Sequence, residues 1–475
     1  MSNNTKINPW LKQKLPEAEP RGSTLSYIIE VVPGSQERVK AELMNIARVA
    51  GIPPIDIIGQ PADRFLTISA PSAALPLIEA MPEVVKISAE TLAWIKSPSI
   101  LNSLTQLKSG FKTPEKFDPY LGPIELSPVE IPVGPAQALA LAGVRALSIN
   151  NIIVFTTESQ RAYIGVPKDN KITTRCAVAD TGLFFPHFLI HPNSKVELRS
   201  TVPFEPIPED GLGHGTWCST CAFGDDAVHP RWGRCEGIAD PSEQIHVKCL
   251  SNLGFGMTSW ILEAIYKAYE YGAKVLSLSL GGPLQGSAID DDPQCRLISA
   301  LKDKMMCVVA AGNDGLPWTI GSPGACPDAL TVGAWSMTDN GLSWFSSRGP
   351  SGEFYRDNVD VWNNDLSRVG DNLIKPDVCA PGGGRVNGEA KDEQILSGCA
   401  GWMDPYSEPL PGWGLMKGTS MSCPAVTGAL AILYDRGIIR NVDDVKRVMS
   451  KVKAKDPYVG YGLFHFSYFG VEGGG

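Results

Sequence analysis

The stretch LMKGTSMSCPAVTGALAILYDRG, residues 415–437, changes within a few residues from a polar, glycine-containing segment to a long apolar run. The apolar residues fall on nearly all sides of a helical projection, so the pattern predicts a buried helix rather than an amphipathic one. Pro424 is tolerated only in the first turn of a helix, so the helix is expected to begin close to Ser420. Ser420 would then lie at the positive end of the helix dipole, which suits either an N-cap or a group that develops negative charge.

Upstream of this helix, short apolar segments alternate with helical patterns. The segments expected as strands are RCAVAD, QIHVKCL, AKVLSLSL, KMMCVVAAG and DALTVGAW, and those expected as helices are TSWILEAIYKAYEYG and PQCRLISALKDK. Apolar strands that alternate with helices predict an α/β fold, in which a parallel sheet is covered by helices on both faces. In such sheets, active residues gather at the carboxyl ends of the strands.

Three polar residues follow expected strands or open an expected helix. Asp180 ends the first strand, His214 stands between two glycines in DGLGHGTWC, and Asn313 follows VVAAG. Singly, each has a structural explanation as a turn former, a cap or a packed histidine. Together with Ser420, however, they supply what nucleophilic acyl transfer requires: imidazole takes the hydroxyl proton and the carboxylate orients the imidazole. The Asn313 amide and the Ser420 backbone N–H would form an oxyanion hole.

The segments VADTG, HGT, AAGN and GTSMSCP resemble the four signature segments of the subtilase family of subtilisin-like serine proteases, in the family's order. Supporting segments are LSLGGP, SPGACPDALTVGAW, FSSRGP, KPDVCAPGG and GYGLFHF, so the resemblance covers residues 172–467. It implies a subtilisin-like fold and a serine endopeptidase. It also implies Asp180, His214 and Ser420 as the catalytic triad and Asn313 as the oxyanion donor.

The resemblance also implies where a substrate binds. LGFGMTSW and SLGG are similar to the family's two substrate-pairing segments, which offer backbone edges on both sides of an extended peptide. The specificity pocket would have an open floor and an aspartate, Asp314, at its rim that tolerates a basic side chain. Ordinary turn geometry is the alternative explanation for the glycines. The implied substrate-binding residues are Gly254, Gly256, Ser279, Leu280, Gly281, Gly312 and Gly321, the last of these at the pocket floor.

Some positions depart from the family pattern. The family's frequent His-Pro-Asp-Leu stretch is replaced here by PHFLI at residues 186–190. The usual residues of the family's structural calcium site are therefore not present in this stretch. A calcium site elsewhere in the chain is left open. No cofactor is expected for catalysis and no metal site is predicted. Trp217 follows HGT where many relatives carry a smaller or polar residue, and Ala425 stands where many carry histidine.

The segment 25–95 forms a separate unit. Its predicted order is strand, helix, strand, strand, helix, strand, which is the ferredoxin-like α+β arrangement. One face of the first helix is expected to present Val39, Leu43, Ile46 and Val49. The unit resembles the inhibitory propeptide domain of subtilases, which implies a self-processing zymogen whose partners are polypeptide substrates and its own propeptide. The cleavage point is expected between residues 95 and 125.

The expected organisation is therefore a flexible leader at 1–24, the propeptide-like domain at 25–95, and a linker with the start of the mature region at 96–170. The catalytic domain would occupy 171–475. Helices are expected at 97–108 and 136–147 within the linker, and residues 351–417 look like inserted loops over the substrate face.

Composition narrows the function classes. The chain of 475 residues carries 42 basic and 51 acidic side chains, and this net charge of -9 argues against a nucleic-acid partner. No apolar run approaches the roughly 18 residues of a membrane span. The first residues lack the apolar core of a secretory signal, which favours an intracellular protein over a secreted one. Eleven cysteines without a repeated CxxC pair are expected to be mostly free and buried, with room for one or two disulfides.

Two other functions stay open beside the endopeptidase. A peptide macrocyclase or transpeptidase would use the same triad, with an amine in place of water, and the long 351–417 insert is compatible with a lid that excludes water. The other is a non-catalytic scaffold derived from the fold. The presence of Asp180, His214, Asn313 and Ser420 together weighs against this function.

Overall fold

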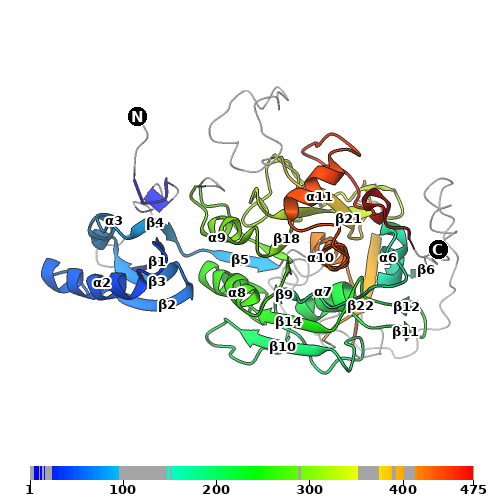
Figure 1. Cartoon of the computed structure of the whole chain (residues 1–475), viewed down its shortest axis with the longest axis horizontal. Helices are drawn as coiled ribbons and strands as arrows, with labels where there is room; N and C mark the ends of the chain where they lie inside the picture. The colour runs from blue at the N-terminus through cyan, green and yellow to red at the C-terminus, as the bar shows by residue number, and fades with distance from the viewer. Residues whose placement is uncertain are drawn as a thin grey trace, which may run out of the picture.

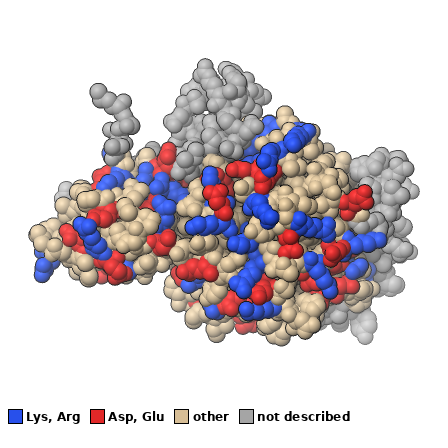
Figure 2. All heavy atoms as spheres, viewed as in Figure 1, with Lys and Arg blue, Asp and Glu red and all other residues tan. Residues whose placement is uncertain are grey.

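We describe the chain from a computed structural model that covers residues 5–9, 11–12, 15, 24–95, 147–149, 152–286, 290–350, 374–387, 392–400 and 412–473. Two units are present, a small one at the N-terminal side and a large one, and strand β5 (Leu92–Ile95) runs from the first into the second (Figure 1). On the face drawn in Figure 2, basic and acidic side chains of both units are interspersed. Among the described residues, no helix combines the length and apolar character that crossing a membrane requires.

The small unit has the predicted order of strands and helices. Its sheet is antiparallel with the strand order β2-β3-β1-β4, and α2 and α3 complete it. Val39 and Leu43 of α2 are buried as expected, but Val49 is 75% exposed, and Ala47 takes the inward position instead. The bounds are β1 Thr24–Val31, α2 Gln36–Ala50, β2 Asp56–Ala62, β3 Phe65–Pro71, the short 3-10 helix η1 Ser72–Ala74, α3 Leu75–Glu79 and β4 Val84–Ala89.

Part of the expected flexible leader is packed against this sheet. The backbone of residues 5–9 runs alongside β4: Ile87 N–H donates to Lys6 O and Asn8 N–H donates to Ile87 O, both at 2.8 Å. Ile7 and Leu11 are buried in the core of the small unit. The leader prediction is therefore wrong for these residues, because an apolar residue every few positions lets them add to an open sheet edge.

The large unit is built on an eight-stranded sheet in which β10, β14, β9, β16, β18, β19 and β21 pair in parallel and β20 pairs antiparallel at the end. Alternate residues of β9 enter different cores: Val178 packs with α7 and α10, and Ala177 packs with α8 and α9. Helices therefore cover both faces, as the sequence predicts. The strands are β9 Cys176–Asp180, β10 Lys195–Ser200, β14 Glu243–Lys248, β16 Val275–Leu278, β18 Met306–Ala310, β19 Leu330–Ser336, β20 Gly341–Leu342 and β21 Val378–Pro381.

The helices of the large unit are α7 His214–Phe223, α8 Thr258–Glu270, α9 Pro293–Leu301, α10 Thr419–Asp435, α11 Val442–Met449 and the 3-10 helix η6 Phe466–Phe469. Two small two-stranded sheets join β8 Lys171–Ile172 to β13 Asp240–Pro241 and β11 Ala227–His229 to β12 Gly233–Cys235. All eleven cysteines lie in the described ranges, and each is buried and outside any disulfide.

A second sheet uses residues that the sequence assigned to the linker. Strand β7 (Ile152–Thr156) pairs in parallel with β22 (Asp392–Gly398), and β6 (Leu147–Ile149) and β23 (Trp413–Met416) complete the order β23-β22-β7-β6. Helix α6 (Thr157–Ile164) follows β7. The large unit therefore begins before the predicted boundary at 171. The expected helices at 97–108 and 136–147 lie outside the described residues, except for Leu147, which begins β6.

Candidate active site

Helix α10 begins one residue before Ser420, close to the predicted start, but Pro424 lies inside the helix rather than in its first turn. Proline has no N–H, so it cannot donate to the carbonyl four residues earlier, which belongs to Ser420. That carbonyl instead accepts the Ser279 hydroxyl at 3.0 Å and the Cys218 thiol at 3.5 Å. Pro424 thus frees the Ser420 carbonyl to join α10 to two other segments of the site.

The Ser420 side chain lies at a strand edge. Its Oγ donates to the Ser279 carbonyl at 3.2 Å, and the whole residue is buried. Ser279 stands between β16 and the short strand β17 (Leu280–Gly281). The structure therefore places the Ser420 hydroxyl beside the segment that the sequence assigns to substrate pairing.

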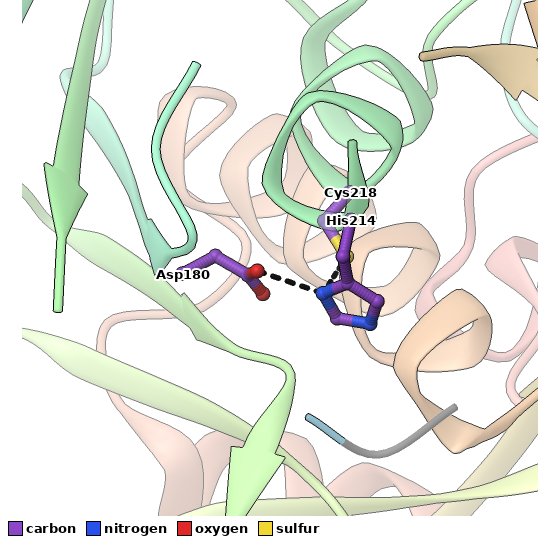
Figure 3. A group of neighbouring side chains, drawn as sticks. All are labelled: Asp180, His214 and Cys218. Carbon is purple, nitrogen blue, oxygen red and sulfur yellow. Dashed lines mark hydrogen bonds and ion pairs between the residues drawn. The ribbon is translucent and has the colours of Figure 1, made fainter. Parts of the chain in front are cut away.

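Asp180 and His214 meet at the carboxyl end of β9 and the start of α7, as Figure 3 shows. His214 Nδ1 lies 2.7 Å from Asp180 Oδ1, and both side chains are buried. A carboxylate can only accept, so Nδ1 carries the proton and Nε2 presents a lone pair. Within the described residues, His214 Nε2 has no hydrogen-bond partner.

No hydrogen bond joins Ser420 Oγ to His214 Nε2 among the described contacts. The two residues nevertheless share a neighbour: Cys218 Sγ is 3.9 Å from His214 Nδ1 and 3.5 Å from Ser420 O. Cys218 comes from the turn of α7 that follows His214, so one sulfur lies between the imidazole and the backbone of α10. Burial raises the pKa of the Cys218 thiol, and the Asp180 carboxylate acts in the same direction.

Asp210 is a positioning residue that the sequence reasoning missed. Its buried carboxylate accepts hydrogen bonds from the loop after Asp180 and from the first residues of α7, and so fixes the two chain segments that carry Asp180 and His214. The available signal was an aspartate four residues before His214, at a helix start where carboxylates cap free N–H groups. The donors are Thr181 Oγ1 at 2.8 Å, Leu212 N at 3.0 Å, Gly213 N at 2.7 Å, and Thr216 N and Oγ1, both at 2.7 Å.

Asn313 is oriented by the residue that precedes Ser420. Its Oδ1 accepts Thr419 N at 2.9 Å and Thr419 Oγ1 at 3.1 Å, and Gly312 N donates to the same Thr419 hydroxyl at 3.1 Å. The amide nitrogen must then point away from Thr419. This Nδ2 is buried without a hydrogen-bond partner among the described residues, a state that costs about 1–3 kcal/mol unless a ligand accepts it.

The two predicted substrate segments both pair with the chain's own strand β5 (Leu92–Ile95). Strand β15 (Phe255–Met257) pairs antiparallel on one side, with Gly256 opposite Ala93, and β17 pairs on the other, with Leu280 opposite Ile95. Ile95 N also donates to Gly254 O at 3.1 Å. The structure thus brings Gly254, Gly256, Leu280 and Gly281 together around one extended segment.

Gly321 lies so close to a neighbouring backbone segment that a side chain would not fit. A Cβ at this position would lie 2.1 Å from the carbonyl oxygen of Gly282, and Ser322 exchanges two backbone hydrogen bonds with Gly282 at 2.8 and 3.0 Å. The residue therefore permits close approach of two chain segments beside the substrate edge, which is compatible with its predicted place at a pocket floor.

The chemistry of the nearby residues does not resemble a calcium site. Calcium takes oxygen ligands, whereas the cluster Asp180, His214 and Cys218, with ligand atoms within 4.8 Å of one another, mixes oxygen, nitrogen and sulfur. Leu189, in the PHFLI stretch that replaces the family's His-Pro-Asp-Leu, is buried in an apolar cluster with Leu396 and Trp413.

Comparisons with known proteins identify the family of this chain. A profile described as "Subtilase family" matches residues 173–462. "Serine protease AprX" of Bacillus subtilis is 28% identical over 306 residues, 60% of this chain and 62% of that protein. "Membrane-bound transcription factor site-1 protease" of Homo sapiens is 30% identical over 263 residues, 54% of this chain but only 20% of that protein. The chain therefore matches less than two thirds of the length of these relatives.

A solved structure shares the fold. The "Epidermin Leader Peptide Processing Serine Protease (EpiP) from Staphylococcus aureus" superposes with a TM-score of 0.58 over 94% of this chain and 98% of that one, at 17% sequence identity. The predicted fold class, a subtilisin-like parallel sheet with helices on both faces after a small α+β unit, is confirmed. With a profile match over more than half of its length, this chain belongs to the subtilase family.

Proposed function

We propose that this protein is a serine endopeptidase in which Ser420 is the nucleophile, His214 the general base, Asp180 its orienting carboxylate and Asn313 an oxyanion donor. One observation carries the proposal: two buried polar atoms, an acceptor at His214 Nε2 and a donor at Asn313 Nδ2, lack partners in the described residues beside Ser420. An acyl-transfer reaction needs an acceptor for the hydroxyl proton and a donor for the oxyanion.

The proposed reaction begins when Ser420 Oγ turns from the Ser279 carbonyl toward His214 Nε2, a contact that tightens in many enzymes only with substrate bound. As the Oγ–carbon bond forms, the proton passes to Nε2 and the oxyanion takes the Asn313 amide and the Ser420 N–H. The imidazolium, stabilised by Asp180, then protonates the leaving amine as the C–N bond breaks. Water repeats the sequence on the acyl-enzyme, with His214 again as the base. No cofactor enters these steps.

We further propose that the small unit is an inhibitory propeptide and that the chain processes itself. Strand β5 occupies both edges on which an extended substrate would pair, and Asp180, His214 and Ser420 are at most 1% exposed. Hydrogen bonds between backbones hold a peptide in this mode with little dependence on side chains. A zymogen is inactive because its own chain blocks the substrate site, and the position of β5 supports this proposal.

Casein cleavage, measured together with labelling by a serine-directed fluorophosphonate, tests the proposal. Wild-type protein should cleave and label, and Ser420→Ala should do neither. Ser422→Ala is the matched control, since its buried Oγ has no hydrogen-bond partner in the described residues and lies two residues along the same helix. A ligated or cyclised product would instead indicate a transpeptidase. Absence of labelling in wild-type protein from which the small unit has been removed would indicate a scaffold.

A further inference from the structure

Strand β5 alternates between solvent and protein. Leu92 is 49% exposed, whereas Ala93 and Ile95 are 1% and 4% exposed. The side-chain period of a strand is two, so Ala93 and Ile95 point to the same side, into the core that also holds Leu212, Leu250 and Leu280. If the small unit is the first substrate of its own enzyme, Ala93 and Ile95 are examples of the side chains that the enzyme accepts at these two positions. This inference rests on the proposed function.

The Ile95 side chain fills an apolar space beside the loop that carries His214. A Cβ built on Gly254 would lie 3.1 Å from Ile95 Cδ1 and 3.2 Å from Leu212 Cδ2, so the two side chains meet over this glycine. Leu212 is itself buried and comes two residues before His214. A charged side chain in the place of Ile95 would be buried here against apolar atoms, which is costly without a partner.

Ala93 is held between glycines. It lies opposite Gly256 on one side, and a Cβ built on Gly282 would be only 3.3 Å from the Ala93 Cβ. Gly282 cannot move aside easily, because its N–H and carbonyl are both bonded to Ser322. Ala93 is also only 1% exposed and belongs to the core that holds Leu250 and Leu280, so a much larger side chain would have to displace this packing.

The register fixes where a bound peptide is cut. Ile95 pairs with Leu280, so the next substrate residue faces Ser279, whose carbonyl accepts the Ser420 hydroxyl at 3.2 Å. A peptide in the register of β5 therefore brings the carbonyl of that next residue to the nucleophile.

We propose that the enzyme prefers extended polypeptides with a small residue, any residue and then a β-branched aliphatic residue, and cuts after the residue that follows. In the chain's own numbering the two selected positions are those of Ala93 and Ile95. Leu212 is the specificity-determining residue for the second position.

Internally quenched peptides test this preference on the processed wild-type enzyme. The reference peptide carries Ala-Trp-Ile-Lys before the cut; one variant replaces Ile by Asp and another replaces Ala by Phe. Each replacement should lower kcat/KM by about tenfold or more, since an apolar pocket discriminates a misfit by roughly 10- to 200-fold. In Leu212→Ala, a peptide with Phe in place of Ile should improve relative to the reference.

Equal kcat/KM for all three peptides, or an unchanged Phe-to-Ile ratio in Leu212→Ala, would overturn the preference while leaving the endopeptidase intact. If no peptide is cleaved and Ser420 does not react with a fluorophosphonate, the proposed function itself fails. The two failures are thus separate.

A different observation points to a second contact between the units. Asn8 is fully buried, and its Nδ2 donates across the unit boundary to Gln285 O at 2.8 Å and Asp291 O at 3.1 Å. Beside it, the Gln285 side chain bonds the backbone N–H and carbonyl of Ala89 at 3.1 and 3.0 Å, and Lys86 pairs with Asp291 at 2.5 Å. One asparagine therefore ties residues 5–9, the edge strand β4 and the loop before α9 together.

We infer that residues 5–9 form a strap that retains the small unit on the enzyme after the bond following β5 is cut. The strap adds to the sheet edge through two backbone hydrogen bonds, and Thr5 Oγ1 and Lys6 N bond Glu79 Oε1 at 2.6 and 2.7 Å. None of the described contacts of residues 5–9 involves β5, so cleavage after β5 leaves these contacts in place.

The strap is tested in the full chain with Asn8→Ala. The control is Asn45→Ala, which changes an asparagine of α2 whose side-chain oxygen accepts a hydrogen bond from the neighbouring Arg48. During activation, Asn8→Ala should release its small unit about tenfold faster on gel filtration, and Asn45→Ala should behave as wild type. In the uncleaved Ser420→Ala background, hydrogen exchange at Ile87 should speed up with Asn8→Ala. Unchanged release and unchanged exchange would refute the strap, and the second readout does not depend on proteolysis.

Discussion

The Oδ1 atom of Asn313 accepts the backbone N–H of Thr419 at 2.9 Å, and this bond decides which end of the amide faces the nucleophile. Oδ1 is committed to the residue before Ser420, so Nδ2 is the end left for a ligand. Asn313 and Ser420, the proposed oxyanion donor and nucleophile, are therefore linked through Thr419.

Asn313→Ala should lower kcat by about a hundred- to a thousand-fold with little change in KM, because the amide binds the oxyanion rather than the ground state. Asn313→Asp keeps an acceptor for Thr419 but removes the donor, so it should lose as much activity as alanine. Steady-state kinetics on a short peptide measure both. An effect on KM alone would contradict the oxyanion role.

Ser420→Ala should reduce hydrolysis by about a million-fold while the fold is retained, since no other atom replaces the attacking hydroxyl. Circular dichroism and the thermal midpoint, compared with those of Ser422→Ala, control for folding. More than a few per cent of residual activity in a folded variant would exclude Ser420 as the nucleophile.

Self-cleavage should produce a new N-terminus at residue 97, because a substrate that extends the pairing of Ile95 with Leu280 by one residue would present its next carbonyl beside Ser279 and Ser420. Intact-mass measurement of wild-type protein after incubation should give this product, and Ser420→Ala should stay full length. A first cut elsewhere between residues 95 and 125 would refute the register, and a fully active but uncut chain would make the small unit a permanent domain.

A mercurial should inhibit the processed enzyme by binding Cys218 Sγ, 3.9 Å from His214 Nδ1, and displacing the imidazole. Cys218→Ser should remove the sensitivity. Because Cys218 is fully buried, uncleaved Ser420→Ala should bind mercury more slowly than the processed enzyme. Equal inhibition of Cys218→Ser would contradict this prediction and would indicate that the mercurial binds Cys221 or Cys423.

The contribution of Glu393 to the stability of the fold should decrease as the pH rises from about 4.5 to about 7. Burial raises the pKa of Glu393 from its ordinary 4.5 to about 7, although Ser336 Oγ, Met337 N and Thr338 N donate to it. Over this window the folded state holds a proton on Glu393 that the unfolded state releases. The contribution of Glu393 to stability is therefore fully present below pH 4.5 and decreases by about 3 kcal/mol by pH 7. Urea unfolding of wild type and Glu393→Gln measures it, and the variant should lose this slope. Identical slopes would show that Glu393 is ionised throughout.

Local pattern was enough to predict several features. Apolar periodicity gave the strand and helix order of the small unit and the helix-covered parallel sheet, because side-chain alternation and helical spacing are set by neighbours in sequence. Asp180, His214, Asn313 and Ser420 were identified as the candidate site because their segments resemble the subtilase signature segments in the family's order, and because these residue types together can perform acyl transfer. These local patterns do not predict which segments distant in the sequence come into contact.

The tertiary structure decided the rest. Strand β7 pairs with β22 from the far end of the chain, Asp210 collects donors from two segments, and Asn8 bonds a loop more than 270 residues away. Pro424 is tolerated inside α10 because the Ser420 carbonyl, which loses its helical partner, accepts the Ser279 hydroxyl instead. Such contacts depend on how whole elements pack and on the need of every buried polar group for a partner, and no local sequence pattern encodes either.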